Sequence, residues 1–116
     1  MKIVSLDDVE RQKVEMDGVL GACKQVPVSG GDGSPLMALR VFSIEPGGHT
    51  PRHRHPYEHI NYIISGSGFL KDQDGNDRLL KTGDFALVLP DELHQYRNGS
   101  SEEPLVMICL VPREFE

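Results

Sequence analysis

Short apolar runs alternate with turn-forming residues along most of the chain, and each run is short enough to be a single β-strand. Glycine, proline, asparagine, aspartate or serine bounds almost every run. Turn signals recur at intervals of roughly ten residues, a spacing typical of an all-β sandwich or barrel. We therefore predict an all-β fold, with strands over residues 36–44, 59–64, 69–71, 78–80, 85–89, 94–96 and 105–111.

The clearest turn signals divide these predicted strands from one another. Glu45-Pro46-Gly47-Gly48 is expected to end the strand over 36–44. The segment 72–77 contains Asp74-Gly75 and predicts a hairpin between its flanking strands. Residues 1–35 are the least regular part, with an acidic stretch that suggests a turn or the start of a helix. We predict a single domain over 1–116, with an irregular N-terminal arm over 1–35 and a barrel core over 36–112.

Composition narrows the classes of function without choosing one. The 116 residues fit one core, and a net charge of −6 without a basic cluster argues against a nucleic-acid partner. No apolar stretch approaches the roughly 18 residues needed to cross a bilayer, so no membrane partner is expected. Asp7, Asp8 and Glu10 fall where a signal peptide would be apolar. Cys23 and Cys109 match no metal or redox spacing, so we expect reduced thiols in a cytoplasmic protein.

Histidine clustering is the strongest chemical signal in the sequence. Four of the five histidines fall within residues 49–59. In a strand, His53 and His55 would point to the same side about 7 Å apart and could share one ion at about 2.1 Å per nitrogen. In a straight strand His59 would lie about 13 Å beyond His55, too far to share that ion. The chain must therefore bend if His59 is to take part, and Pro56 is placed to end the strand there.

Two segments resemble the two conserved motifs of the cupin superfamily. Gly47 to Gly66 reads GGHTPRHRHPYEHINYIISG, and Gly83 to Asn98 reads GDFALVLPDELHQYRN. The string HRHPYEH is typical of small single-domain, cupin 2-type proteins with a four-histidine metal site. The resemblance covers about residues 36–112 and implies a double-stranded β-helix, or jelly-roll barrel. It implies His53, His55, His59 and His94 as the metal ligands.

Two positions depart from the usual motifs. His59 stands where the third ligand is commonly a glutamate, and neighbouring Glu58 is a rival for that role. Strand alternation favours Glu58, since it shares parity with the apolar Ile60, whereas the motif spacing favours His59. In the second motif Pro90 is displaced by one residue and Asp91 stands in place of a glycine.

Further residues are weaker candidates for a role at the site. His49 lies outside both motifs and is expected at the rim or in a solvated loop. Arg52 and Arg54 alternate with the histidines, so we interpret them as a solvated face. Asn61 and Tyr96 are expected either to face the cavity as polar residues or to satisfy backbone groups, and the sequence favours neither role. Met107 and Cys109 share parity on the last strand and are expected to line the barrel interior.

Four neutral imidazoles would leave a divalent ion its full charge and two open coordination positions, unlike a closed structural zinc site. We expect one divalent transition metal per chain: imidazole ligands suit iron, nickel, copper and zinc, and the family resemblance adds manganese. The favoured function is a metal-dependent oxidoreductase with dioxygenase-like chemistry on a small-molecule substrate, and no catalytic residue is assigned. A decarboxylase or isomerase, a non-enzymatic binding module and a structural zinc barrel stay open. A homodimer is expected, because edge strands of so small a barrel need covering.

Overall fold

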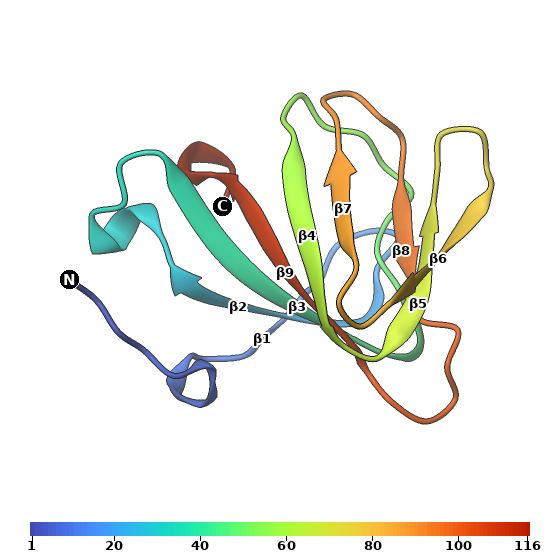
Figure 1. The fold of residues 1–116 in the computed structure, drawn as a ribbon, viewed down its shortest axis with the longest axis horizontal. Helices are drawn as coiled ribbons and strands as arrows, with labels where there is room; N and C mark the ends of the chain where they lie inside the picture. The colour runs from blue at the N-terminus through green and yellow to red at the C-terminus, as the bar shows by residue number, and fades with distance from the viewer.

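A computed structural model describes all residues of the chain, 1–116, and consists almost entirely of strands (Figure 1). Three short 3₁₀ turns, Leu6–Asp8, Gly30–Asp32 and Arg113–Phe115, lie before the first strand, between the second and third strands, and after the last strand. The strands are β1 (Gln12–Lys13), β2 (Leu20–Val28), β3 (Met37–His49), β4 (His59–Ser65), β5 (Ser67–Lys71), β6 (Asp77–Lys81), β7 (Phe85–Val88), β8 (Gln95–Arg97) and β9 (Leu105–Pro112).

The strands form one antiparallel sheet that curls upon itself. Its order is β6-β5-β8-β3-β9-β4-β7, and β2 pairs with the other edge of β3. Figure 1 shows β2, β3 and β9 on one side of the molecule and β4 to β8 on the other. The prediction of an all-β, double-stranded β-helical fold is confirmed.

Alternation of side chains explains most of this sheet. On β9 the buried residues are Leu105, Met107, Cys109 and Val111, one at every second position, as expected of a strand with one inward face. The predicted hairpin also forms: β5 and β6 pair up to Lys71 and Asp77, and Gly75 adopts a φ of 86° in the turn.

The predicted break after residue 44 is wrong. β3 continues to His49, and Glu45, Pro46, Gly47 and Gly48 lie inside it. The extra residues are taken up by a register shift, because Ala22 pairs with Ile44 whereas Leu20 pairs with His49. Gly47 has a φ of 77°, which allows the strand to bend as it passes from the β9 side to β8. The turn-forming residues therefore mark a bulge.

Part of the segment predicted as an irregular arm is regular. β2 occupies nine residues of it and pairs with β3. Gln25 on β2 is buried, and its side-chain amide donates to the carbonyls of Leu6 and Val9, which ties the 3₁₀ turn at the N-terminus to the sheet.

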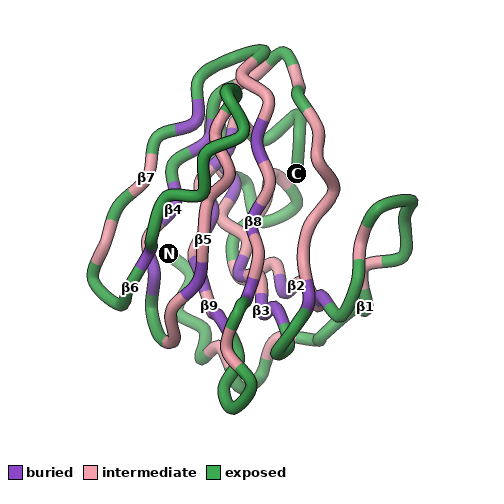
Figure 2. The backbone as a smooth tube through the Cα atoms, turned by 90° about the vertical axis from the view of Figure 1, so that its right-hand side faces the viewer, coloured by how far each residue is buried: buried purple, intermediate pink, exposed green.

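The core lies inside the curl of the sheet. Its main cluster is Ala22, Ile44, Ile63, Leu80, Tyr96, Leu105 and Met107, and a smaller one is Ala38, Cys109 and Val111. Figure 2 shows buried segments on the central strands, whereas much of β6 and the β1 region are exposed. The chain contains no helix long and apolar enough to cross a membrane.

Candidate metal centre

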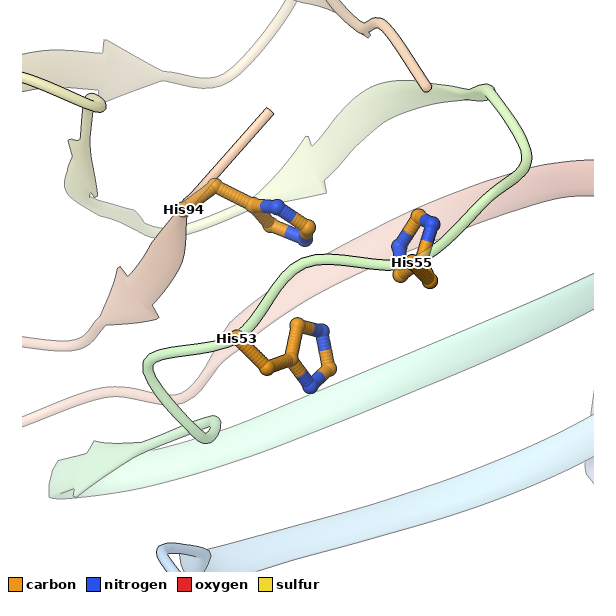
Figure 3. Close-up of side chains that lie close together, drawn as sticks. All are labelled: His53, His55 and His94. Atoms are coloured by element: carbon orange, nitrogen blue, oxygen red, sulfur yellow. The ribbon is translucent and has the colours of Figure 1, made fainter. Parts of the chain in front are cut away.

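Three histidines from the two motif segments converge in space. The ligand atoms of His53, His55 and His94 all lie within 4.8 Å of one another. His53 and His55 belong to the loop between β3 and β4, and His94 directly precedes β8 (Figure 3). We expected a strand through His53 and His55, but only an isolated bridge forms there. In it, His53 and His94 exchange two backbone hydrogen bonds of 3.1 and 3.0 Å.

His59 lies beside this trio. It opens β4, is buried, and its ring centroid is 5.1 Å from those of both His55 and His94. Its Nε2 is 3.3 Å from Nε2 of His94. Glu58 is exposed, and the inward face of β4 carries His59, Asn61 and Ile63. The parity argument for Glu58 was therefore wrong, because the apolar side chain of Ile60 lies on the outer face.

Hydrogen bonds at Nδ1 fix the orientation of three of the four rings. Nδ1 of His55 lies 2.7 Å from the Tyr57 carbonyl, and Nδ1 of His94 lies 2.8 Å from the Glu92 carbonyl. Nδ1 of His59 lies 2.7 Å from Oδ1 of Asn61. A carbonyl oxygen only accepts, so each Nδ1 must donate and each Nε2 of a neutral ring must present a lone pair. This arrangement is the one that orients histidines toward metals.

Burial keeps these imidazoles neutral. It lowers the pKa of His53 to about 4, with neighbouring His94 adding to the effect. Burial likewise lowers the pKa of His59 to about 3, and it lowers the pKa values of His55 and His94. Deprotonated imidazole is the form that binds a metal ion, so the rings are ready to coordinate near neutral pH.

The donor set fits a divalent transition metal. The lone pairs of His59 and His94 face each other at 3.3 Å without a proton between them, which is unfavourable unless a cation is shared. Two nitrogens at about 2.1 Å from one ion lie about 3.0–3.4 Å apart when the angle at the ion is between about 90° and about 110°. The observed separation falls in that interval.

These histidines lie at one wall of a cavity of about 420 Å³. Asn61 and Tyr96 are buried beside them, and the Tyr96 hydroxyl donates to Asn61 Oδ1. Burial raises the pKa of Tyr96 far above its usual value, so the phenol keeps its proton. Met107 and Cys109 line the same cavity, which confirms their predicted inward parity.

The remaining sequence candidates lie outside the cluster. His49 is half-buried at the end of β3, with Nδ1 near the Thr50 carbonyl. Arg54 is exposed, as expected. Arg52 is not simply solvated, because its guanidinium donates to the carbonyls of Lys71 and Asp72 and holds the β5–β6 turn against the loop of the histidines.

Comparison with known proteins places this fold and site in one family. The profile of Cupin_2, described as "Cupin domain", matches residues 40–111. The chain belongs to the Cupin_2 family. The match includes all four motif histidines and every strand from β4 to β8.

Several relatives of this cupin are informative. Protein SchB of Streptomyces halstedii is 28% identical over 111 residues, which are 96% of this chain and 78% of SchB. The polyketide cyclase RemF of Streptomyces resistomycificus superimposes with a TM-score of 0.91 at 26% identity, over 97% of this chain and 79% of RemF. A predicted oxalate decarboxylase of Thermotoga maritima has a TM-score of 0.84 at 21% identity, over 97% and 99% of the two chains, and this likeness shows the fold alone.

The departure in the second cupin motif has a local explanation. Asp91 adopts a φ of 63°, the left-handed conformation that a glycine would adopt most readily. Aspartate tolerates this region better than most residues. The Asp91 amide donates to the His55 carbonyl at 2.7 Å, so this turn also positions the histidine loop.

Arg40 is among the cavity residues that were not predicted from the sequence. Arg40 on β3 lines the cavity together with the histidines, and its positive charge contributes to the lowered pKa values of His53, His55 and His59. A signal was present, because Arg40 is the only charged residue of the predicted strand 36–44.

Proposed function

We propose that this cupin binds one divalent transition metal through four histidines and acts as a metal-dependent enzyme on a small organic molecule. The ligands would be His53, His55 and His94, with His59 as the fourth. One observation carries this proposal: three imidazoles converge at the wall of a largely apolar cavity, and the buried imidazole of His59 lies 3.3 Å from one of them.

The reaction class that we favour is ring closure of a polyketide-like carbonyl compound. RemF is described as a polyketide cyclase, and its likeness to this chain extends over nearly the whole of it. The bound metal would act as a Lewis acid toward a carbonyl oxygen. Ring closure also needs the substrate folded and shielded from water, and a cavity of this size suits a small substrate.

The residues around the cavity support chemistry centred on the metal. The Tyr96 hydroxyl donates a hydrogen bond to Asn61 and stays protonated, so it supplies no base. Glu15 is the only carboxylate of the cavity lining, and it lies exposed at 3.9 Å from Lys13. The chain's own groups therefore position the ion and the substrate, and they place no general base beside the histidines.

Dioxygenase-like oxidation, the function favoured from the sequence, is the second candidate. Its support is the donor set, because four neutral imidazoles leave the full charge on the ion and favour the reduced state of a redox metal. Decarboxylation and isomerisation are alternatives within the same fold, and the cavity places no acid or base beside the histidines that would favour either. A non-enzymatic binding barrel would use the same histidines without turnover.

Metal analysis combined with turnover tests the proposal. We expect about one metal ion per chain in purified protein, and loss of most of it in His59→Ala. His49→Ala is the matched control, since it removes a histidine outside the cluster and should leave metal content unchanged. The loaded protein is then offered aromatic poly-β-ketones, with product analysis and dioxygen consumption followed together. Cyclised product without dioxygen uptake supports ring closure, dioxygen uptake supports the oxygenase, and failure to retain any metal contradicts both.

A further inference from the structure

We infer that Arg40 forms an anion-binding subsite in the cavity, and that the natural ligand is an organic acid whose carboxylate or enolate oxygen binds this guanidinium. The inference rests on the proposed function for the ligand's proximity to a metal. The subsite itself is argued from Arg40 and the cavity around it, and it can be tested without the metal.

The side chain of Arg40 is held in place, but its guanidinium lacks strong hydrogen-bond partners. It extends from β3 opposite Cys109 on β9, and its Nη2 lies 3.1 Å from the Cys109 sulfur, a weak acceptor. The guanidinium carbon lies 5.0 Å from the centroid of the Phe42 ring, so the ring covers one face of the guanidinium. Its Nε is buried and has no hydrogen-bond partner, the only such side-chain atom in the protein.

No carboxylate of the protein neutralises Arg40. The four ion pairs of the structure lie elsewhere, and Arg40 belongs to none of them. A half-buried guanidinium without an anion is unfavourable, because it has lost water and gained no counter-charge. Such a group is retained more readily when a ligand supplies the missing charge.

The charge balance of the cavity points the same way. Its lining contains three cations, Lys13, Lys24 and Arg40, and one anion, Glu15, which Lys13 already pairs. This positive cavity occurs in a protein whose net charge is −6. An anion would therefore be attracted to the cavity although the protein as a whole repels it.

The apolar lining restricts the class of anion further. Val14, Val19, Phe42 and Met107 contribute apolar surface next to the guanidinium and the histidines. The planar fork of an arginine matches a carboxylate, and a volume of about 420 Å³ accommodates a small organic body but not a polymer. The chemistry that would be recognised is a small acid with an apolar, ring-sized body.

Binding of matched acids and amides to metal-free protein tests the subsite. The probes are benzoate, 3-phenylpropanoate and 1-naphthoate, each compared with its primary carboxamide by calorimetry and ligand-observed NMR. At least one acid should bind about 10- to 100-fold more tightly than its amide, as expected of a charge-assisted pair. In Arg40→Met this preference should fall to about twofold or less, and Arg40→Lys should retain part of it.

Controls separate the subsite from general charge and from folding. Arg78→Met removes the same charge from an exposed position on β6 and should keep the acid preference. Ligand-free Arg40→Met should melt at or above the wild-type temperature, because an unneutralised charge is removed. A clearly lower melting temperature would assign Arg40 a structural role and overturn the inference.

Failure of the inference and failure of the proposed function give different results. If no acid is preferred by the wild type, or if the preference survives in Arg40→Met, the inference is wrong whatever the metal does. If the protein retains no metal or turns over no substrate while the preference depends on Arg40, the proposed function fails and the anion subsite stands.

Discussion

Asn61 connects the candidate metal centre to the interior of the barrel. Its Oδ1 accepts from both Nδ1 of His59 and the Tyr96 hydroxyl, and its Nδ2 donates to the Ile108 carbonyl at 3.2 Å. These bonds determine which way the amide is turned. Asn61 therefore sets the tautomer of His59 and directs its Nε2 toward His94.

Replacing Asn61 by leucine should weaken metal binding more than it weakens the fold. His59 loses the acceptor that orients it, and changes of this kind typically cost about 10- to 100-fold in metal affinity. Competition with a chelator of known affinity measures the loss. Asn61→Asp keeps an acceptor for His59 and should recover most of the affinity. Equal affinities in the leucine variant and the wild type would contradict the role given to Asn61.

The buried histidines should make the metal-free protein sensitive to acid. Their folded pKa values, about 4 for His53 and about 3 for His59, lie below the ordinary value of 6.5. Between these limits the unfolded chain binds more protons than the folded one, so stability falls as the pH drops below 6.5. The loss is at most about 1.4 kcal/mol per pH unit for each histidine that stays neutral. Urea unfolding at several pH values measures it.

His59→Gln and His49→Gln make a matched pair for this pH dependence. The first removes a group with a lowered pKa, so its stability should change less between pH 6.5 and 4 than that of the wild type. The second removes a histidine outside the cluster and should leave the slope unchanged. A slope that is the same in all three proteins would contradict the assignment.

The sequence predicted which residues lie at the candidate site better than it predicted which residues contact one another there. HxH spacing correctly predicted that His53 and His55 lie close together, although they belong to a loop and not to the expected strand. Alternation misled at Glu58, because the outer face of β4 carries Ile60 and Ile64 at 44% and 38% exposure, so hydrophobicity did not mark the inward face. Asn61 and its partner His59 lie two residues apart on β4, but the amide of Asn61 is also bound by Tyr96 on β8, a contact that no local pattern contains.

Among the elements, the tight connection between β4 and β5 depends on one glycine. Gly66 has a φ of 80°, and a Cβ there would collide with the carbonyl oxygen of Pro104 before β9. Both the backbone conformation and the close approach of two chain segments therefore require glycine.

Gly66→Ala should destabilise the protein by more than about 2 kcal/mol, because it adds a backbone collision to left-handed strain. Gly47→Ala is the control, since Gly47 has a φ of 77° but nothing within 4 Å of its added Cβ. Denaturant unfolding of both variants separates the two costs. Equal losses would mean that strain alone accounts for the effect.

Strands with one buried face could be predicted from the sequence, whereas a bulge could not. The β5–β6 hairpin and the alternation of β9 follow from local patterns. Pro46 and Gly47 have the composition of a turn, yet they lie inside β3, because Asn98 binds this bend from outside the local sequence. The Gly47 amide donates to the Asn98 carbonyl at 2.9 Å, and the Asn98 amide donates to Gly48. Those contacts depend on a segment fifty residues away.

Considered as a whole, the molecule has an apolar outer surface over β4 and β7. Phe85 and Leu87 are 75% and 55% exposed, and Ile60 lies on the neighbouring strand β4. β7 pairs with β4 only and so forms one edge of the sheet, and its sequence FALV carries no charge that would discourage pairing. An edge of this kind is suited to a second strand.

The homodimer expected from the sequence stays a prediction, and this surface is where we expect it. Leu87→Asp should shift the protein toward monomer, measured by light scattering after size exclusion. Leu79→Asp, at a 67% exposed leucine on β6 at the opposite end of the sheet order, should leave the mass unchanged. A monomeric wild type, or a dimer that survives Leu87→Asp, would contradict this interface.

The backbone pairing of His53 with His94 separates the candidate ligands into two groups during folding. His53, His55 and His59 lie within seven residues, so an unfolded chain can already hold an ion weakly through them. His94 joins only when its backbone pairs with that of His53. An ion that also binds the unfolded chain stabilises the fold by less than its affinity for the native site implies. Excess metal would therefore also stabilise the denatured chain. The gain in the free energy of unfolding should level off as the metal concentration rises.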